Sequence, residues 1–126
     1  MLTMNERTEL LGAAVEAARI GGTFLREYFG KRKEIVFKSA IDPVTNADMA
    51  SERAIVDFIA TRFPCHDIVT EETRPDLSGS PYRWVIDPLD GTVNYAHDHP
   101  MVAVSVGVEV DGMVEAGAVY NPIREE

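Results

Sequence analysis

Cysteine is nearly absent from this sequence, because Cys65 is the only one in 126 residues. A single thiol excludes an intrachain disulfide. Since only His66 stands beside it as a second metal-binding side chain, we interpret Cys65 as an ordinary packed or semi-exposed thiol and not as a zinc ligand. The sequence also lacks a signal peptide and an apolar run long enough to cross a membrane, which predicts a reducing, cytoplasmic location.

Positive charge is scarce as well. Lys and Arg total 12 against 21 acidic residues, and the formal net charge is −9. This balance argues against an extended basic surface, so we expect neither direct nucleic-acid binding nor binding to an anionic membrane. Acidic side chains instead suit the binding of cations.

The chain has enough apolar material for one compact domain. Hydrophobic residues make up 45% of the sequence, which suffices for a packed core, whereas the length is too short for two ordinary domains. No internal repeat, low-complexity segment or interdomain linker interrupts it. We therefore expect residues 1–126 to form a single unit.

Two helices are expected in the first half of the chain. Apolar residues at three- and four-residue spacing predict one helix from about Asn5 to Phe29, closed by Gly30. The pair Gly21-Gly22 inside it indicates close helix packing or a bend. A second helix is predicted from about Asn46 to Arg62, ended by Pro64. The residues expected to face the core are Leu11, Ala14, Val15, Ala18, Gly22, Leu25, Phe29, Ala50, Ala54, Ile55, Phe58 and Ile59.

Strands are expected in the second half. Short apolar runs predict strands at residues 35–37, 67–70 and 84–86. Valines alternate with small or polar residues from Val102 to Val110, and Asp111-Gly112 then turns the chain back toward Tyr120. That pattern is typical of a β-hairpin. Helices followed by mainly antiparallel strands indicate an α+β fold.

The segment from Trp84 to Tyr95 carries the strongest chemical signal. Its apolar start ends in Asp87 and Asp90, three residues apart, followed at once by Gly91-Thr92. If Pro88 stiffens the bend and Asp90 returns to the side of Asp87, the two carboxylates can converge on one hard cation. Backbone N–H groups at Gly91-Thr92 suit a phosphate oxygen. The alternative is an acidic turn that caps a short helix.

Three segments together resemble the motifs of the inositol monophosphatase family. Asp87 to Tyr95 matches the signature Asp-Pro-(Ile/Leu)-Asp-Gly-Thr-x-Asn-(Phe/Tyr) without a gap. Ile68 to Glu72 resembles the family's strand that ends in Gly-Glu-Glu, and Asp42 to Asp48 resembles Asp-x-Val-Thr-x-x-Asp. Thr70 replaces the common Gly, as in the SuhB-like bacterial branch. The motifs stand in family order and the resemblance spans nearly the whole chain.

This resemblance implies a fold and a missing portion. It implies the N-terminal half of an αβαβα sandwich, with two helices packed on a mainly antiparallel sheet, so that residues 1–126 form the metal- and phosphate-binding domain. In the family a second half supplies another metal-binding Asp and residues that hold the substrate. A C-terminal domain is therefore expected to be absent here, and the full-length form is expected to be a homodimer.

The resemblance also implies a metal site. Two or three Mg²⁺ ions are expected, with inhibition by lithium. Glu71, Asp87 and the Leu89 carbonyl would bind the first ion, and Asp87 and Asp90 would share a second. Bridging by Asp87 would bring two cations close together, one beside the attacking water and one beside the leaving oxygen.

Further roles follow from the same resemblance. Glu71 and Thr92, the latter paired with Asp48, would orient and deprotonate the water. The N–H groups of Gly91 and Thr92 would hold the phosphate. For Asp48 a structural alternative exists, because its position three residues after Thr45 fits a capping box that only satisfies backbone N–H groups.

Other polar residues are weaker candidates. Glu72 points away from Glu71 in a strand, and Lys38 could balance the acids or lie solvated in a loop. His97 and His99 could bind zinc, but surface or packing roles are favoured because no other nitrogen or sulfur donors cluster with them. Asp111 is assigned to the hairpin turn.

The implied activity is Mg²⁺-dependent hydrolysis of a phosphomonoester, with inositol monophosphate as the first substrate. Fructose 1,6-bisphosphate, glycerol phosphates and histidinol phosphate remain alternatives. A second class of function is an interaction protein that acts with transcription machinery, as in the SuhB-like branch. A third is a cation-binding domain unrelated to phosphatases, which requires the three motif matches to be coincidence.

We expect the 126-residue chain to hydrolyse inositol monophosphate poorly or not at all in the presence of Mg²⁺. The resemblance places a further metal ligand and one wall of the substrate pocket in a second half. Release of inorganic phosphate by the purified chain measures this, and robust Mg²⁺-dependent turnover would contradict it.

Overall fold

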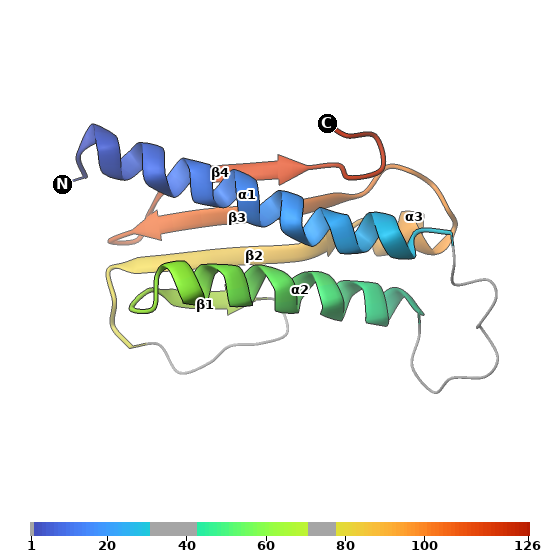
Figure 1. The fold of residues 1–126 in the computed structure, drawn as a ribbon, viewed down its shortest axis with the longest axis horizontal. Coiled ribbons are helices and arrows are strands. Elements are labelled where there is room, and N and C mark those ends of the chain that lie inside the picture. Colours follow the sequence, from blue (N-terminus) through green and yellow to red (C-terminus); the bar gives the residue numbers. More distant parts are fainter. Residues whose placement is uncertain (1, 31–42, 71–77) are drawn as a thin grey trace.

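A computed structural model describes residues 2–30, 43–70 and 78–126 of the chain (Figure 1). Within these ranges it contains three helices and four strands. In chain order they are α1 (Met4–Tyr28), α2 (Pro43–Arg62), β1 (Asp67–Thr70), β2 (Tyr82–Asp90), α3 (Thr92–Ala96), β3 (Ala103–Val110) and β4 (Met113–Tyr120). The strand predicted at residues 35–37 lies outside the described residues.

The four strands form one sheet in the order β1-β2-β3-β4. Strand β1 is parallel to β2, whereas the pairs β2–β3 and β3–β4 are antiparallel. The long helices α1 and α2 run in opposite directions on the same face of this sheet (Figure 1). The predicted α+β fold, with two helices on a mainly antiparallel sheet, is therefore confirmed.

Residues that favour the start and the end of a helix flank α1. The Thr3 hydroxyl accepts a hydrogen bond from the Glu6 N–H at 3.1 Å, and the Glu6 carboxylate accepts one from the Thr3 N–H at 3.3 Å. This reciprocal pair is a capping box. At the other end Phe29 leaves the helical conformation, and Gly30 follows with a φ of +78°. The predicted helix differs from the observed one by a single residue at each end.

The buried face of α1 differs from the predicted stripe, in which Val15 and Phe29 are only half-buried. Its buried residues are Leu10, Ala13, Ala14, Ala17, Ala18, Gly21, Gly22 and Leu25. The prediction that Leu11 belongs to the core is wrong, because this residue is 47% exposed. Hydropathy alone predicts that leucine is buried in preference to alanine. Close packing of α1 against its neighbours instead buries the small residues of the helix.

Gly21 and Gly22 allow α1 to approach two different neighbours. A Cβ atom on Gly21 would lie 2.5 Å from Ile55 Cδ1 and 2.7 Å from Ser51 Oγ, both on α2. A Cβ atom on Gly22 would lie 2.8 Å from the Tyr120 ring at the end of β4. Real Cβ atoms do not approach other atoms so closely. The close-packing interpretation of this pair is confirmed.

Helix α2 begins at Pro43, earlier than the predicted start near Asn46. Proline is favoured at the first helical position because it has no N–H group that needs a partner. Thr45 therefore lies inside the helix and not at its N-cap. Of the residues predicted to face inward, Ile55 and Ile59 are buried, whereas Ala50, Ala54 and Phe58 are half-buried.

The hydrophobic core lies between the sheet and the two long helices. Its strand residues include Trp84, Ile86, Val104, Val106 and Val108, all buried. Every second residue of β3 therefore faces the helices, as the valine alternation predicts. Asp111 (φ 52°) and Gly112 (φ 82°) form the turn to β4. Two positive φ values in a two-residue loop match the twist of a tight hairpin, so the predicted hairpin and the turn role of Asp111 are confirmed.

None of the helices in the described ranges combines the length and the hydrophobicity that a bilayer crossing requires.

We expect Gly21→Ala to lower the free energy of unfolding by about 1–3 kcal/mol, because the added methyl group overlaps Ile55 and Ser51. Chemical denaturation of both proteins measures the difference. Gly12→Ala is the matched control on the same helix, since nothing lies within 4 Å of its Cβ position. It should stabilise by about 0.5–1 kcal/mol through helix propensity. Equal effects of the two substitutions would contradict the packing interpretation.

Candidate active site at the end of strand β2

The two signature acids, Asp87 and Asp90, lie at the end of β2, where its pairing with β3 is irregular. Asp87 is paired with Ser105 and Asp90 with Ala103, and the register shifts between these two pairs. β2 advances by three residues (90 − 87) while β3 advances by two (105 − 103). One extra residue in one strand defines a β-bulge.

The bulge determines which face of the sheet carries Asp90. In a regular strand, residues three apart point to opposite faces. Because Ser105 and Ala103 are two apart on β3, they share a face, and their partners Asp87 and Asp90 share it as well. This is the face away from α1 and α2, since Val104 and Val106 of β3 point toward the helices. The predicted return of Asp90 to the side of Asp87 is confirmed by this register.

Two hydrogen bonds hold the backbone between the acids. The buried Ser51 hydroxyl of α2 donates to the Pro88 carbonyl at 3.0 Å. The Leu89 N–H donates to Asp87 Oδ1 at 3.3 Å, and the Leu89 side chain is buried. Pro88 stands in the bulge, one of the few strand positions where a missing N–H is tolerated. Sequence reasoning missed Ser51, although a serine four residues after the buried Ala47 and four before Ile55 indicates a polar contact in an apolar stripe.

Gly91 turns the chain from β2 into α3. Its φ is +90°, and a Cβ atom here would lie 2.9 Å from the Met101 carbonyl oxygen, so only glycine fits. No side chain caps α3, whose first residue is Thr92. Thr92 is exposed and Asp90 is exposed, whereas Asp87 is half-buried. The segment predicted to bind phosphate is thus an exposed turn directly beside the acids.

Asn94 and Tyr95, the last two residues of the signature, have structural contacts. The Asn94 side-chain amide donates to the Met101 carbonyl at 2.9 Å. The buried Tyr95 hydroxyl donates to the Leu25 carbonyl at 2.7 Å, and its ring meets Phe29 edge-on at 5.5 Å. These contacts fix α3 against the end of α1, and therefore fix the turn that precedes it.

Asp48 and Thr92 lie on neighbouring elements. Asp48 is half-buried on α2, and α2 contacts α3, which begins at Thr92. Their direct pairing stays a prediction.

Glu71, Glu72 and Lys38 lie outside the described residues. The strand that precedes Glu71 is nevertheless placed: Thr70, its last residue, is paired with Ile86, which directly precedes Asp87. Parallel strands end at the same edge of a sheet, so β1 and β2 lead to the same side of the molecule.

The donors at the end of β2 fit a hard cation. Asp87, Asp90 and the Leu89 carbonyl offer only oxygen atoms, the ligands that Mg²⁺ prefers. Within residues 2–30, 43–70 and 78–126, no three His, Cys, Asp or Glu side chains come together as a metal site. The described residues at this strand end therefore offer oxygen donors, and Glu71 stays a predicted further donor.

A hollow of about 420 Å³ adjoins these residues. Its polar lining comes from Asp90, Asn94, Asn121 and Glu126, and Gly91 also borders it. The carboxylates of Asp90 and Glu126 provide hydrogen-bond acceptors for a hydroxylated molecule on this side of the signature turn.

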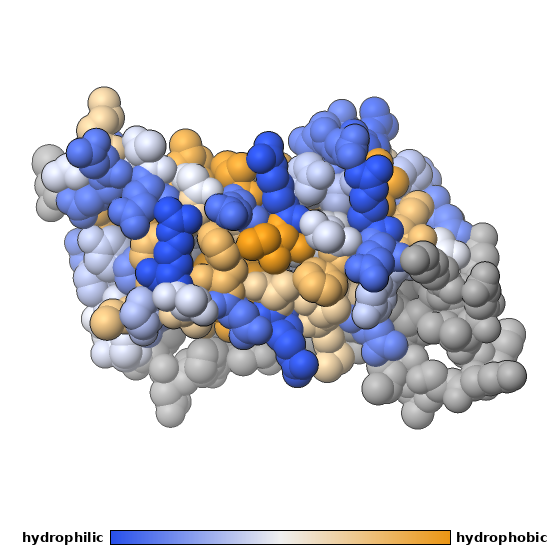
Figure 2. All heavy atoms as spheres, in the orientation of Figure 1, coloured by the Kyte–Doolittle hydropathy of each residue, from blue (hydrophilic) through white to orange (hydrophobic). Residues whose placement is uncertain are grey.

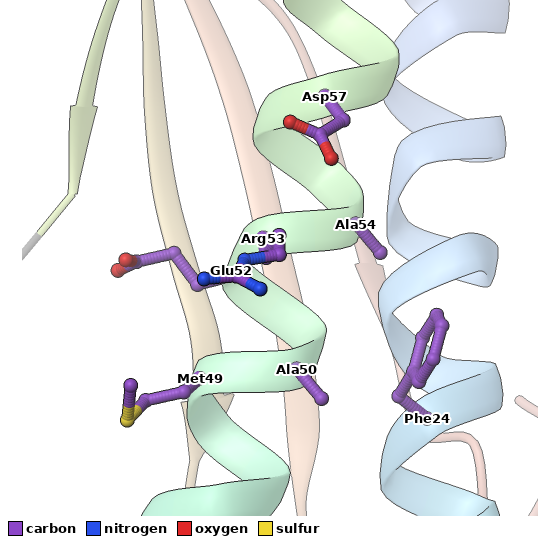
Figure 3. Close-up of a pocket in the computed structure, with 7 residues that line it drawn as sticks. All are labelled: Phe24, Met49, Ala50, Glu52, Arg53, Ala54 and Asp57. Atoms are coloured by element: carbon purple, nitrogen blue, oxygen red, sulfur yellow. The ribbon is translucent and has the colours of Figure 1, made fainter.

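A second hollow, of about 530 Å³, lies between α1 and α2 (Figure 3). Phe24 of α1 faces Ala50 and Ala54 of α2, whereas Met49 and Glu52 point to the other side of α2. Figure 2 shows apolar side chains in the middle of this helical face, with charged ones around them. None of the signature residues lines this hollow, so it is separate from the candidate site.

The histidines and the cysteine have other contacts. His97 Nδ1 lies 2.8 Å from the Val93 carbonyl, and His66 Nδ1 accepts a hydrogen bond from Trp84. Cys65 is exposed. Neither predicted zinc alternative gains support from the described residues.

Comparison with known proteins identifies the family. The model of the inositol monophosphatase family matches residues 6–126. Inositol monophosphatase 3 from Solanum lycopersicum is 41% identical over 94% of this chain and 46% of its own length. Nus factor SuhB from Pasteurella multocida is 43% identical over 93% of this chain and 45% of its own. The fructose-1,6-bisphosphatase/inositol-1-monophosphatase of Aquifex aeolicus is 45% identical over 94% and 46%.

A solved structure agrees with these relatives. The extragenic suppressor protein SuhB from Bartonella henselae superposes with a TM-score of 0.81 at 32% identity, over 94% of this chain and 46% of that one. The chain thus spans about half the length of the curated relatives it matches. A family match along nearly all of the chain and a shared fold lead to one conclusion: the chain belongs to the inositol monophosphatase family.

Proposed function

We propose that this chain is the metal- and phosphate-binding half of a Mg²⁺-dependent phosphomonoester hydrolase, with inositol monophosphate as its first substrate. The observation that carries the proposal is the β-bulge, which places Asp87 and Asp90 on one face of the sheet beside the Gly91 turn. Two adjacent carboxylates repel each other, and a bound cation relieves that repulsion. Membership of the family supports the reaction class.

Four residues would hold the metal. Asp87, Asp90 and the Leu89 carbonyl would do so from β2, and Glu71 from the segment after β1. Bound there, Mg²⁺ supplies positive charge that lowers the pKa of water and stabilises the oxygen that leaves phosphorus. Asp87 is well suited to a shared role, because its Oδ1 already accepts the Leu89 N–H, which fixes the carboxylate orientation.

The remaining chemistry belongs to the signature turn and its neighbours. Backbone N–H groups of Gly91 and Thr92 hold the phosphate oxygens. Glu71 and the Thr92 hydroxyl, the latter paired with Asp48, orient a water and take its proton. The water oxygen bonds to phosphorus as the ester P–O bond breaks, which gives an alcohol and inorganic phosphate. No covalent enzyme intermediate forms.

The face of the sheet away from α1 and α2 supports a second half like that of the relatives. We call it the open face. One row of paired residues crosses all four strands there: Val69, Val85, Gly107 and Gly117. Val85 is 41% exposed and Val119, two residues along β4, is 68% exposed. Since Asp87 lies on the same face, polypeptide that covers it would also enclose the site and provide the substrate wall.

The substrate class follows from that arrangement. Asp90 and Asn94 line the adjoining hollow, so their side-chain oxygens can accept hydrogen bonds from a hydroxylated ring. Inositol monophosphate has this character, and so do sugar phosphates such as fructose 1,6-bisphosphate. The double name of the Aquifex aeolicus relative supports both.

One relative supports a different function. The name Nus factor SuhB, carried by a protein 43% identical to this chain, makes an interaction with transcription machinery the second candidate. The two acids separate the candidates, because a protein-binding surface does not need two carboxylates on one face of a strand end. Mg²⁺-dependent turnover by a full-length form, measured beside binding to transcription factors, discriminates between them.

We expect Asp90→Asn to remove most turnover in a full-length form that joins this chain to a second half like that of its relatives. The substitution removes one negative charge from the metal site while it keeps the side-chain shape. Steady-state kinetics at saturating Mg²⁺ measures the loss. Asp111→Asn is the matched control, since it removes one charge at the exposed hairpin turn and should leave kcat unchanged. Near-normal kcat in Asp90→Asn would show that the metal assignment is wrong.

We expect Thr92→Ala to lower kcat by about 10²-fold or more, the scale for losing acid-base assistance, with a much smaller change in KM. The substitution removes the hydroxyl that orients water but keeps the N–H that holds phosphate. Thr92→Ser should restore most of the rate.

The partner substitution tests the pairing. If Asp48 and Thr92 act as one unit, Asp48→Asn and the double variant should show strongly non-additive losses of kcat. Additive losses, or a lower melting temperature with unchanged turnover of Asp48→Asn, would refute the pair.

A further inference from the structure

His66 lies at the corner where α2 leads into β1, and three aromatic side chains surround it. Its ring stacks on Phe63 with centroids 4.6 Å apart and planes inclined by 11°. It also stacks on Tyr82, at 4.3 Å and 6°. Trp84 lies slightly farther away, at 6.4 Å. The imidazole therefore contacts the segment after α2 and the beginning of β2 at once.

One hydrogen bond determines the protonation state of this imidazole. The Trp84 Nε1–H donates to His66 Nδ1 at 3.0 Å, and Trp84 is fully buried. An indole N–H can only donate. His66 Nδ1 must therefore be unprotonated, and the single ring proton must be on Nε2. Protonation of Nδ1 would leave a buried indole N–H without its partner and place a positive charge among aromatic rings.

The position of this contact links three elements. His66 directly precedes Asp67, the first residue of β1, while Tyr82 and Trp84 are the first and third residues of β2. β1 and β2 are parallel, so their beginnings meet at this corner. Their far ends lead to Thr70 and Asp87. Among the described strands β1 pairs only with β2, and the Asp67 carboxylate at its start also accepts hydrogen bonds from the Ser78 N–H and hydroxyl.

We propose that His66 is a pH-sensitive positioning residue: uncharged, it holds the beginnings of β1 and β2 together through Trp84, and protonated, it releases the indole and loosens β1. This inference does not depend on the proposed phosphatase activity.

The partly buried position of His66 supports its neutral form near pH 7. Burial lowers the pKa of His66, and Glu9 on α1 opposes this by favouring the cation. The charged or titratable residues on the elements around the corner are Glu9, Arg62, Asp67, Tyr82 and Arg83. Because the folded pKa is the lower one, the contribution of this contact is complete above about pH 6.5, the ordinary value for histidine. It is lost as the pH falls through the lowered value.

Trp84 is the only tryptophan in the chain, so its indole reports on this contact alone. In the 126-residue chain, we expect the Trp84 Nε1–H resonance to shift, and the tryptophan fluorescence to fall, with a midpoint below about pH 6.5. Circular dichroism should keep its native value through that transition. A resonance that does not respond to pH, or a transition that coincides with loss of helical signal, would overturn the proposal.

Substitutions assign the transition. His66→Gln cannot titrate in this range, and its amide oxygen can still accept the indole N–H, so the transition should disappear. The double variant His97→Gln/His99→Gln removes the other two histidines and should keep it. If His66→Gln fails to fold, titration of the wild type and of the double variant still shows whether the transition belongs to His66 or to the other two histidines. A transition that survives in His66→Gln, or vanishes in the double variant, would contradict the assignment.

Amide hydrogen exchange tests the strand response. At a pH below the transition, the Ile68 to Thr70 amides should exchange faster in the wild type than in His66→Gln. The Val104 to Val108 amides of β3 should exchange at the same rate in both proteins. If His66 had only a structural role, its replacement by Gln would change the exchange protection of the β1 amides equally at high and low pH. Equal exchange of β1 in both proteins at low pH would overturn the release of β1.

Discussion

The extra residue in β2 is the constraint on which the candidate site depends. Side chains of a strand alternate between faces, so two acids three residues apart would normally point in opposite directions. The bulge between the Asp87–Ser105 and Asp90–Ala103 pairs removes that conflict and puts both acids on the open face. Pro88 suits the bulge because it has no N–H to pair, and Gly91 suits the turn that follows because only glycine fits beside the Met101 carbonyl.

The bulge is held from the other side of the sheet through the helix pair. Gly21 has no side chain, and the space this leaves is occupied by Ile55 and Ser51 of α2. Ser51 can therefore lie deep enough to donate to the Pro88 carbonyl, in the middle of the bulge. A small residue on α1 thus leaves room for the side chain that hydrogen-bonds the backbone between the two acids. At the opposite end of the same strand, Trp84 and His66 hold β2 to β1.

Family membership and the geometry of the site explain different features of the signature segment. The family match explains why the signature runs unbroken from Asp87 to Tyr95, and the structure separates its residues by task. Asp87 and Asp90 point to the open face, Gly91 makes the turn, and Asn94 and Tyr95 fix α3 through the Met101 and Leu25 carbonyls. Only part of this signature is therefore available for chemistry. The chain spans about half the length of its relatives, and our proposal assigns a second half like theirs to the open face.

The sequence by itself determined what depends on neighbours along the chain. Periodicity placed α1 within one residue, valine alternation and Asp111-Gly112 defined the hairpin, and the acids with Gly91-Thr92 predicted the candidate site. Tertiary structure decided what depends on distant partners. Leu11 is exposed whereas its neighbour Leu10 is buried, because burial depends on which elements pack beside each position of α1. The shared face of Asp87 and Asp90 required the pairing with β3, and the roles of Ser51 and His66 required Pro88 and Trp84 to approach them from other elements. Hydropathy along the chain carries no information about these approaches, since burial and hydrogen bonding are properties of contacts between segments.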